Sequence, residues 1–359
     1  MTSTPKHSAR RHPLRILLVC VLLALVVALA ALVTLFQGEL RTLMTVEKQR
    51  EYPLYTMNYL GDYGFDKYLA EGSASDAELI AFVTRTLLKG IPLPFSIPDL
   101  GCSTFNAVTP EGEAIFGRNF DLSYSPALLV RTQPKDGYAS LSMVNMGFLG
   151  YGEGKLPDSL LSSFILLAAP YAPLDGVNEK GVSIGVLLIP TEPTAQETGK
   201  TPISTTAAVR LVLDKAASVD EAIDLLSRYD MHASAGSSYH FQIADAQGHS
   251  AVVEFEGDVM SVVRADTPYQ ACTNFLQTPA YYGQGKGLER YDLLVRTLAE
   301  KGGVLTMEEG MALLSAVSQP FEDVTSDSDT QWSVMYNNAT GEAVVCAGRD
   351  YENPYFTSL

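Results

Sequence analysis

Hydrophobic and polar positions alternate through much of the chain after residue 100, and this period of two predicts β-strands. The expected strands cover 103–109, 113–118, 127–132, 138–146, 181–189, 239–244, 250–255, 258–264, 269–273, 332–337 and 342–347. Apolar residues at helical spacing predict two helix pairs between them, over 204–217 with 219–228 and over 287–300 with 306–317. Strand runs separated by helix pairs predict an α+β fold, with antiparallel sheets that carry helices on their outer faces.

The start of the chain has a different pattern. Residues 16–36 form an apolar run without charge, long enough at ~1.5 Å per residue to cross a ~30 Å hydrocarbon core. The basic residues ahead of this run are Lys6, Arg10, Arg11 and Arg15. The positive-inside rule therefore predicts a cytoplasmic tail over 1–15, a single-pass signal-anchor over 16–36, and the remainder outside the cell membrane. A cleaved signal peptide is the alternative, although the apolar run continues past its small-residue site at 28–30.

Residues 37–101 predict a folded pre-segment, or propeptide, rich in tyrosine. Ser75 followed by Glu78 is a capping-box pattern and opens a helix that Gly90 and Pro92 end. Pro92, Pro94 and Pro98 predict an extended approach to Gly101. The main domain is expected over 102–359.

Composition narrows the function classes. The chain has 25 basic and 41 acidic residues, a net charge of −16, which makes nucleic acid an improbable partner. Of the four cysteines, only Cys102, Cys272 and Cys346 lie outside the apolar run. An odd number leaves at least one thiol unpaired, so Cys102 is the candidate for chemistry while the other two are core residues or a pair.

Candidate chemistry is concentrated in Gly101-Cys102-Ser103-Thr104-Phe105 and in Gly117-Arg118-Asn119-Phe120-Asp121. Thr109-Pro110-Glu111-Gly112 between them is a turn signal, so the flanking strands are expected to form a hairpin. Such a hairpin brings a cation and a carboxylate back towards the Cys102 thiol.

These two segments resemble the choloylglycine hydrolase and acid-amidase group of N-terminal-nucleophile hydrolases, over residues 102–359. The resemblance implies a four-layer αββα sandwich, preceded here by the transmembrane helix and the helical pre-segment. It also implies that Cys102 is both the autoprocessing and the catalytic nucleophile. Once the Gly101–Cys102 bond is broken, the freed α-amine can act as the base of its own thiol.

The resemblance also implies roles for other residues. Arg118 would lower the thiol pKa, and Asp121 would hold the α-amine, although the two could form a plain ion pair. Asn178 and Asn274 match family positions that stabilise the tetrahedral oxyanion, with a plain turn as the alternative for Asn178. Arg290 is the last candidate, and a solvated arginine at a helix start is its alternative.

The histidines offer a rival, a Cys–His hydrolase that uses His232, His240 or His249. No histidine or cysteine grouping has metal-ligand spacing, and no glycine-rich phosphate loop occurs, so neither a metal nor another cofactor is expected.

The expected function is therefore an exported, autoprocessed cysteine amidohydrolase that cleaves the linear C–N bond of a small-molecule acyl amide. An acyltransferase similar to the 6-aminopenicillanate type and a non-catalytic, membrane-anchored binding protein are the alternatives. The sequence leaves homo-oligomer formation open. Cleavage at Gly101–Cys102 would separate the domain from its anchor, and the pre-segment would then either grip the domain or release it.

Overall fold

Two β-sheets packed face to face form the centre of the molecule, for which the computed structural model describes residues 13–93, 101–320 and 329–359. The larger sheet contains, in spatial order, β1 (Glu47–Arg50), β2 (Leu54–Tyr59), β5 (Ala127–Thr132), β6 (Ser140–Asn145), β7 (Pro173–Asn178), β8 (Ser183–Ile189), β11 (Ser238–Ala244), β12 (Ser250–Glu256) and β13 (Val259–Arg264). The smaller sheet contains β14 (Gln270–Cys272), β3 (Gly101–Val108), β4 (Ala114–Leu122), β15 (Asp329–Asn337), β16 (Glu342–Ala347) and β17 (Tyr355–Ser358). A separate parallel pair joins β9 (Thr201–Ser204) to β10 (Tyr229–His232).

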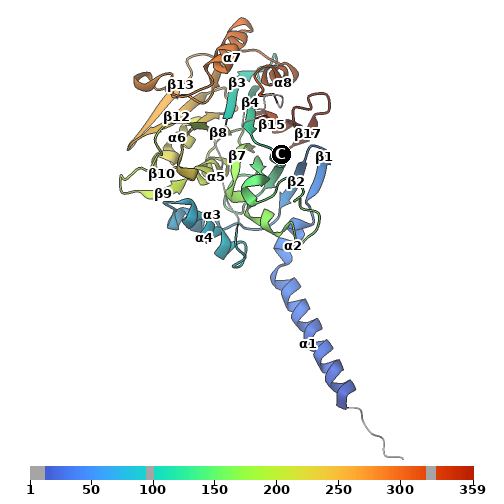
Figure 1. Ribbon diagram of the computed structural model, residues 1–359. Helices are drawn as coiled ribbons and strands as arrows, with labels where there is room; N and C mark the ends of the chain where they lie inside the picture. The colour runs from blue at the N-terminus through green and yellow to red at the C-terminus, as the bar shows by residue number, and fades with distance from the viewer. Residues whose placement is uncertain (1–12, 94–100, 321–328) are drawn as a thin grey trace, which may run out of the picture.

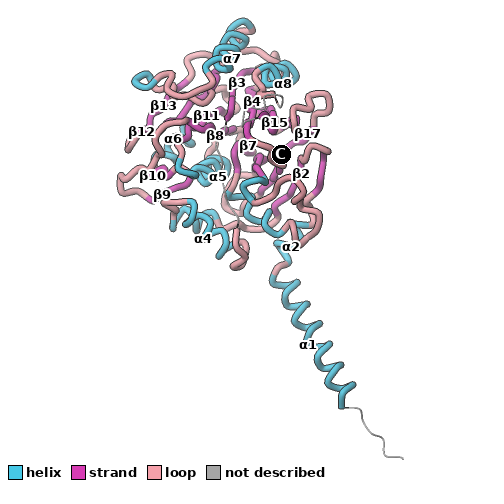
Figure 2. The backbone as a smooth tube through the Cα atoms, viewed as in Figure 1, coloured by secondary structure: helices cyan, strands magenta, loops and turns pink. Residues whose placement is uncertain are grey.

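Helices cover the outer faces of both sheets (Figure 1). The helices are α1 (Pro13–Leu35), α2 (Gln37–Leu43), α3 (Phe65–Glu71), α4 (Asp76–Thr86), α5 (Thr205–Lys215), α6 (Val219–Ser227), α7 (Leu288–Glu300) and α8 (Met307–Ala316), with 3₁₀ turns η1 (Met146–Leu149), η2 (Phe164–Tyr171), η3 (Ser234–Gly236) and η4 (Pro279–Tyr281). The α5–α6 pair packs on the larger sheet, and α7 and α8 pack on the smaller one. The strands consequently gather between the helices (Figure 2), and the expected α+β sandwich of four αββα layers is confirmed.

The alternating pattern of the sequence corresponds to the two faces of the smaller sheet. Phe116 and Phe120 point into the core between the sheets, whereas Phe105 and Ile115 pack under α7 and α8. Both faces are therefore buried.

The structure adds strands to those expected and decides between the two alternatives for Cys272 and Cys346. The region before residue 181 holds a further strand, β7, because Val177 and its neighbours are buried between β6 and β8. The smaller sheet also has an unexpected edge strand, β17. Cys272 and Cys346 are both free thiols in different hydrophobic clusters, so they are core residues and not a pair.

The pre-segment and the main domain, which were expected to meet at residue 102, pack together in one sandwich. Strand β2 of the pre-segment pairs in parallel with β5 of the main domain, from Leu54 opposite Ala127 to Tyr59 opposite Thr132. The tyrosine-rich region buries Tyr63, Phe65 and Tyr68 against Tyr171 of the main domain. The pre-segment is therefore an integral part of the sandwich, and it supplies two strands of the larger sheet.

Helix α1 projects away from the sandwich (Figure 1), and its side chains from Ile16 to Val27 are exposed where the structure describes them. Within the described part of the chain, no helix has both the length and the apolar character needed to span a membrane. The expected anchor over 16–36 is thus not confirmed and stays a prediction.

Candidate active site

The hairpin of β3 and β4 forms as expected and carries the candidate nucleophile. Its turn is closed by hydrogen bonds from Thr109 N to Glu113 O at 2.7 Å and from Gly112 N to Thr109 O at 2.9 Å. Gly112 has a φ of +87°, in the left-handed region that glycine adopts without strain. The register places Cys102 opposite Phe120 and two pairs along the ladder from Arg118, on the same inner face.

Arg118 contacts the thiol directly from within the core. Its Nη2 donates to Cys102 Sγ at 3.2 Å, its Nη1 donates to the carbonyl of Leu174, and its Nε pairs with Asp175 Oδ2 at 3.2 Å. Cys102, Arg118 and Asp175 are all fully buried, with 0% of each exposed. The guanidinium is thereby fixed at three points, with one edge turned to the sulfur.

The pKa of the Cys102 thiol is raised above its ordinary value, because burial outweighs the opposing effect of the Arg118 guanidinium. Arg118 does act to lower this pKa, as expected, but burial has the larger effect and the net shift is upward. Asp175 likewise has a raised pKa through burial, opposed first by Arg118 and then by hydrogen bonds from Tyr336 and Trp332.

Asn274 and Arg290 hold the backbone of Cys102. Asn274 Oδ1 accepts a hydrogen bond from Cys102 N at 3.0 Å and a second one from Arg290 Nη2 at 2.8 Å. Arg290 Nη1 donates to the carbonyl oxygen of Cys102 at 2.7 Å. Both polar groups of the Cys102 backbone therefore face side chains that come from more than 170 positions further along the sequence.

Asp121 lies beside this cluster. Its Oδ1 accepts from Thr330 Oγ1 at 2.6 Å and its Oδ2 pairs with Arg290 Nη1 at 3.3 Å. Burial raises the pKa of its carboxyl, which Arg290 opposes. The amide of Cys102 bonds to Asn274 in the intact chain, and the expected contact of Asp121 with a freed α-amine stays a prediction.

Asn178 is the one candidate that the structure does not bring to Cys102. Its Nδ2 donates to the carbonyls of Leu213 at 3.0 Å and Ala216 at 2.7 Å, at the end of α5. Its Oδ1 accepts from the amides of Lys180 and Val182, both at 3.0 Å. Both amide hydrogens are used, so the expected oxyanion role is corrected: Asn178 ties a turn to a helix end.

The histidine candidates are engaged elsewhere. His232 Nε2 lies 3.0 Å from the carbonyl of Gln196, and His249 Nδ1 lies 3.3 Å from Asp245 Oδ2. His240 binds a glutamate and a backbone carbonyl, and its ring touches the sulfur of Cys272 rather than that of Cys102. Burial raises the pKa of Cys272 well above its ordinary value, so this second thiol stays protonated. The geometry gives no support to a Cys–His hydrolase.

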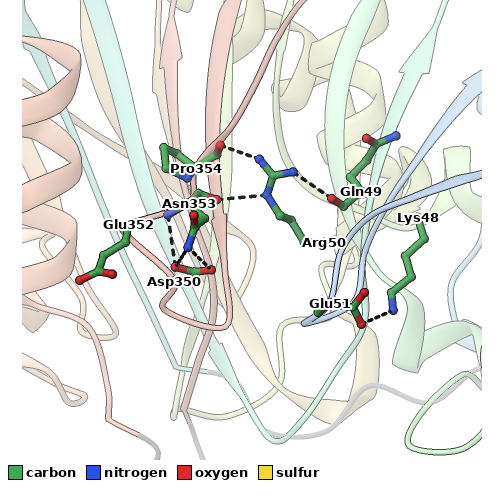
Figure 3. Close-up of a pocket in the computed structure, with 8 residues that line it drawn as sticks. All are labelled: Lys48, Gln49, Arg50, Glu51, Asp350, Glu352, Asn353 and Pro354. Atoms are coloured by element: carbon green, nitrogen blue, oxygen red, sulfur yellow. Dashed lines mark hydrogen bonds and ion pairs between the residues drawn. The ribbon is translucent and has the colours of Figure 1, made fainter.

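A surface cavity of about 650 Å³ lies apart from the cluster, between β1 and the loop before β17 (Figure 3). Its arginine, Arg50, donates to the carbonyls of Asn353 at 3.1 Å and Pro354 at 2.7 Å, and Lys48 pairs with Glu51. These charges are already satisfied within the protein. The cavity therefore lies where the pre-segment meets the C-terminal segment, away from the Cys102 cluster.

One member of the site went unassigned from the sequence. Asp175, which fixes Arg118, stands in the same turn-like segment as Asn178. Nothing in that segment distinguishes a buried carboxylate from a solvated turn aspartate. Asp175 lies within β7, a strand that the sequence did not predict.

The fold and the buried cysteine cluster define an N-terminal-nucleophile type of sandwich. Its likeness to solved structures is one of fold: variants of the conjugated bile acid hydrolase from Clostridium perfringens are 17% identical, with a TM-score of 0.53 over 72% of this chain and 92% of theirs. Penicillin V acylase from Agrobacterium tumefaciens is 17% identical, with a TM-score of 0.51 over 72% of this chain and 86% of that one. A search of curated proteins found no match.

The family follows from the sequence of the domain itself. Residues 102–304 match the model of the linear amide C–N hydrolases, choloylglycine hydrolase family. This match covers more than half of the chain, and it begins at Cys102. The protein belongs to this family and is a hydrolase of linear amide C–N bonds.

Proposed function

We propose that this chain is a cysteine amidohydrolase that becomes active when its Gly101–Cys102 bond is cleaved, and that it acts on small-molecule acyl amides. The observation that carries the proposal is the set of contacts on Cys102. Arg118 binds its sulfur, Asn274 binds its nitrogen and Arg290 binds its carbonyl oxygen. A structural cysteine needs none of these three contacts.

Activation would begin at the same residue. The Cys102 sulfur attacks the carbonyl carbon of Gly101, the C–N bond breaks, and the proton of the thiol passes to the departing α-amine. Water then hydrolyses the resulting thioester, which leaves residue 101 as a carboxylate and Cys102 with a free α-amine and thiol. Asn274 Oδ1 already accepts from this nitrogen in the uncleaved chain, so the new amine is generated next to a fixed acceptor.

Amide hydrolysis would use the two groups that activation creates. The α-amine, whose pKa is ordinarily near ~8, accepts the thiol proton as the sulfur attacks the substrate carbonyl. The tetrahedral intermediate collapses to a thioester as the substrate amine leaves with that proton. A water molecule, deprotonated by the α-amine, then releases the acid. Arg118 stabilises the thiolate through its contact at 3.2 Å.

Asn274 is the oxyanion donor that fits this scheme. Its Nδ2 donates one hydrogen to the carbonyl of Leu188 at 2.8 Å, which leaves the second hydrogen for a substrate oxyanion. Asn178 has no such hydrogen and takes no part in the proposed chemistry.

The location of the enzyme is a separate part of the proposal. Export of residues 37–359, with the basic tail in the cytoplasm, is supported by the sequence of the first 36 residues: basic positions followed by an uncharged apolar run. Fractionation of cells that express the full chain tests it, since a catalytic body accessible to added protease only after cell lysis would contradict export.

A panel of acyl amides with varied acyl groups tests the activity. The account predicts hydrolysis of at least one member by the wild-type protein, and formation of a thioester adduct on the chain that begins at Cys102. Cys102→Ala is expected to abolish both, whereas Cys346→Ala, at a buried free thiol in the other hydrophobic cluster, serves as a matched control that keeps activity. Equal hydrolysis by the wild type and by Cys102→Ala would overturn the proposal.

A further inference from the structure

Asn274, which holds the nitrogen of Cys102, lies in a segment that one buried pair of side chains grips on both sides. The pair is His240 on β11 and Glu254 on β12, and both residues are 0% exposed. His240 Nδ1 lies 3.1 Å from Glu254 Oε1. Neither residue contacts Cys102 itself, so neither belongs to the cluster described above.

The upstream grip is on the residue immediately before Asn274. His240 Nε2 lies 2.8 Å from the carbonyl oxygen of Thr273, which belongs to the peptide unit that continues into Asn274. The ring is thus bonded to a peptide group next to the site residue. A shift of this imidazole would move the start of the Asn274 backbone.

The downstream grip is on the residues that follow Asn274. Glu254 Oε1 accepts from the amide of Gln277 at 2.7 Å, and Oε2 accepts from the amide of Thr278 at 2.8 Å and from its hydroxyl at 2.6 Å. With the bond from His240, the carboxylate accepts four hydrogen bonds, which is its full capacity.

Glu254 acts as a hydrogen-bond acceptor in this arrangement. One ring nitrogen of His240 faces its carboxylate and the other faces the carbonyl of Thr273. Burial acts to raise the pKa of the Glu254 carboxyl, but the hydrogen bond and charge of His240, with the bonds from Thr278 and Gln277, hold that pKa below its ordinary value. A buried ion pair is on average no more stabilising than apolar residues of the same volume. Stability alone therefore does not explain why His240 and Glu254 are buried together. The hydrogen bonds that the two side chains make to three backbone groups around Asn274 do explain it.

We infer that His240 and Glu254 are positioning residues that hold Asn274 in register with the nitrogen of Cys102. This inference rests on the proposed function, in which Asn274 binds the α-amine and the oxyanion. The pair acts through the backbone of 273–278 and makes no contact with substrate. Catalysis would then depend on residues of β11 and β12 as well as on the β3–β4 hairpin that supplies the nucleophile.

Two amide substitutions of His240 separate the two bonds of the ring. In His240→Gln the side-chain nitrogen takes the position of Nε2 and keeps the bond to Thr273. In His240→Asn it takes the position of Nδ1, so the bond to Glu254 remains and that to Thr273 is lost. Both variants replace the ring by an uncharged amide, and they differ from each other by a single methylene group.

The inference predicts that His240→Asn lowers kcat on the order of tenfold to a hundredfold with an unchanged KM, because the reacting groups are displaced. His240→Gln is expected to stay within about threefold of the wild type at a similar melting temperature. Equal losses in the two variants, in proportion to their melting temperatures, would show a merely structural role and overturn the inference.

Crystal structures of the same variants provide a readout that does not depend on turnover. They are expected to show Asn274 Oδ1 displaced from Cys102 N in His240→Asn and in place in His240→Gln. If Asn274 is in place in both, the inference is wrong even where the amidase activity is real. A wild type without amidase activity would instead refute the proposed function, and the structures would still decide the positioning role.

A milder pair of variants covers the case in which the His240 variants do not fold. Thr278→Val removes the hydroxyl bond to Glu254, whereas Thr278→Ser keeps it. The inference predicts a lower kcat for the valine variant only. Identical kcat values for the two would contradict it.

Discussion

Asn274 Oδ1 lies 3.0 Å from the backbone nitrogen of Cys102, a residue 172 positions earlier in the chain. In the uncleaved protein this nitrogen is an amide donor, and after cleavage it would be the amine that accepts the thiol proton. In the proposed mechanism the same acceptor would serve both states. The contact would link activation to catalysis, because the group proposed as the base is already in place before its release.

Substitution of the two candidate asparagines is expected to have different effects, one on catalysis and the other on stability. Asn274→Ala is expected to lower kcat on the order of a hundredfold or more, because a donor to the oxyanion and the acceptor of the amine are both lost. Asn178→Ala is expected to lower the free energy of unfolding by about 1–3 kcal/mol, since its four hydrogen bonds at the end of α5 disappear. Its kcat per folded molecule should stay within about twofold of the wild type. Denaturant titrations and steady-state kinetics check both, and a catalytic loss in Asn178→Ala without a loss of stability would contradict the reassignment.

Arg118→Lys tests how the thiol is activated. Lysine keeps the charge but cannot bind Cys102, Leu174 and Asp175 at once, so the cation is expected to move away from the sulfur. The pKa of the Cys102 thiol should rise further, because burial then acts with less opposition. The rate of alkylation by iodoacetamide, followed against pH, measures this. An unchanged pH profile would mean that Arg118 does not act on the thiol; Arg131→Lys, at a half-buried position of β5, is the control.

Asp214 predicts a pH dependence of stability. Burial, opposed first by Arg210 and then by a hydrogen bond from Tyr63, raises its pKa from 3.8 to about 6. The folded state therefore binds this proton more tightly than the unfolded chain does. The associated stability is fully present below about pH 4 and is lost as the pH rises through about 6, a change on the order of 2–3 kcal/mol.

The difference in unfolding free energy between the wild type and Asp214→Asn isolates this effect from that of the other carboxylates. Between pH 4 and pH 7 the wild type should lose free energy of unfolding relative to Asp214→Asn. Asp66→Asn, an exposed neighbour that pairs with Lys215, should give a difference that does not depend on pH to the same degree. A pH-independent difference for Asp214→Asn would show that its proton affinity is the same in both states.

The packing of the pre-segment predicts a stable two-chain enzyme after cleavage. Tyr63 Oη donates to both oxygens of Asp214, at 2.9 and 2.8 Å, and Tyr171 Oη donates to the carbonyl of Tyr63 at 2.9 Å. With the ladder between β2 and β5, these contacts span the proposed cleavage point without a covalent link. The two pieces are therefore expected to elute together in size-exclusion chromatography, through high salt. Separate elution of an intact piece 102–359 would contradict this packing.

Much of the smaller sheet was predictable because its information is local. The turn at Thr109 to Gly112 and the alternation on either side of it determine the hairpin, and the hairpin places Arg118 near Cys102. Helices α5 to α8 were equally readable from their periodicity. The nucleophile and its cation are close in sequence, so a local pattern was sufficient to bring them together.

The errors concern contacts between distant segments. Asn178 and Asn274 both look like turn or strand-end residues, and only the fold shows that one meets α5 and the other meets Cys102. The pre-segment looked separate because its short strand, β2, has no neighbour in sequence with which to pair. Its partner β5 lies beyond the β3–β4 hairpin, and a parallel pairing across such a distance leaves no local signal.

The mass of the purified full-length chain tests the central claim most directly. The account predicts that the wild type separates under denaturing conditions into two pieces, the larger of which begins at Cys102 with a free α-amine. Cys102→Ala is expected to remain a single chain, because the attacking sulfur is absent. A wild-type chain that is active yet intact across Gly101–Cys102 would contradict the account.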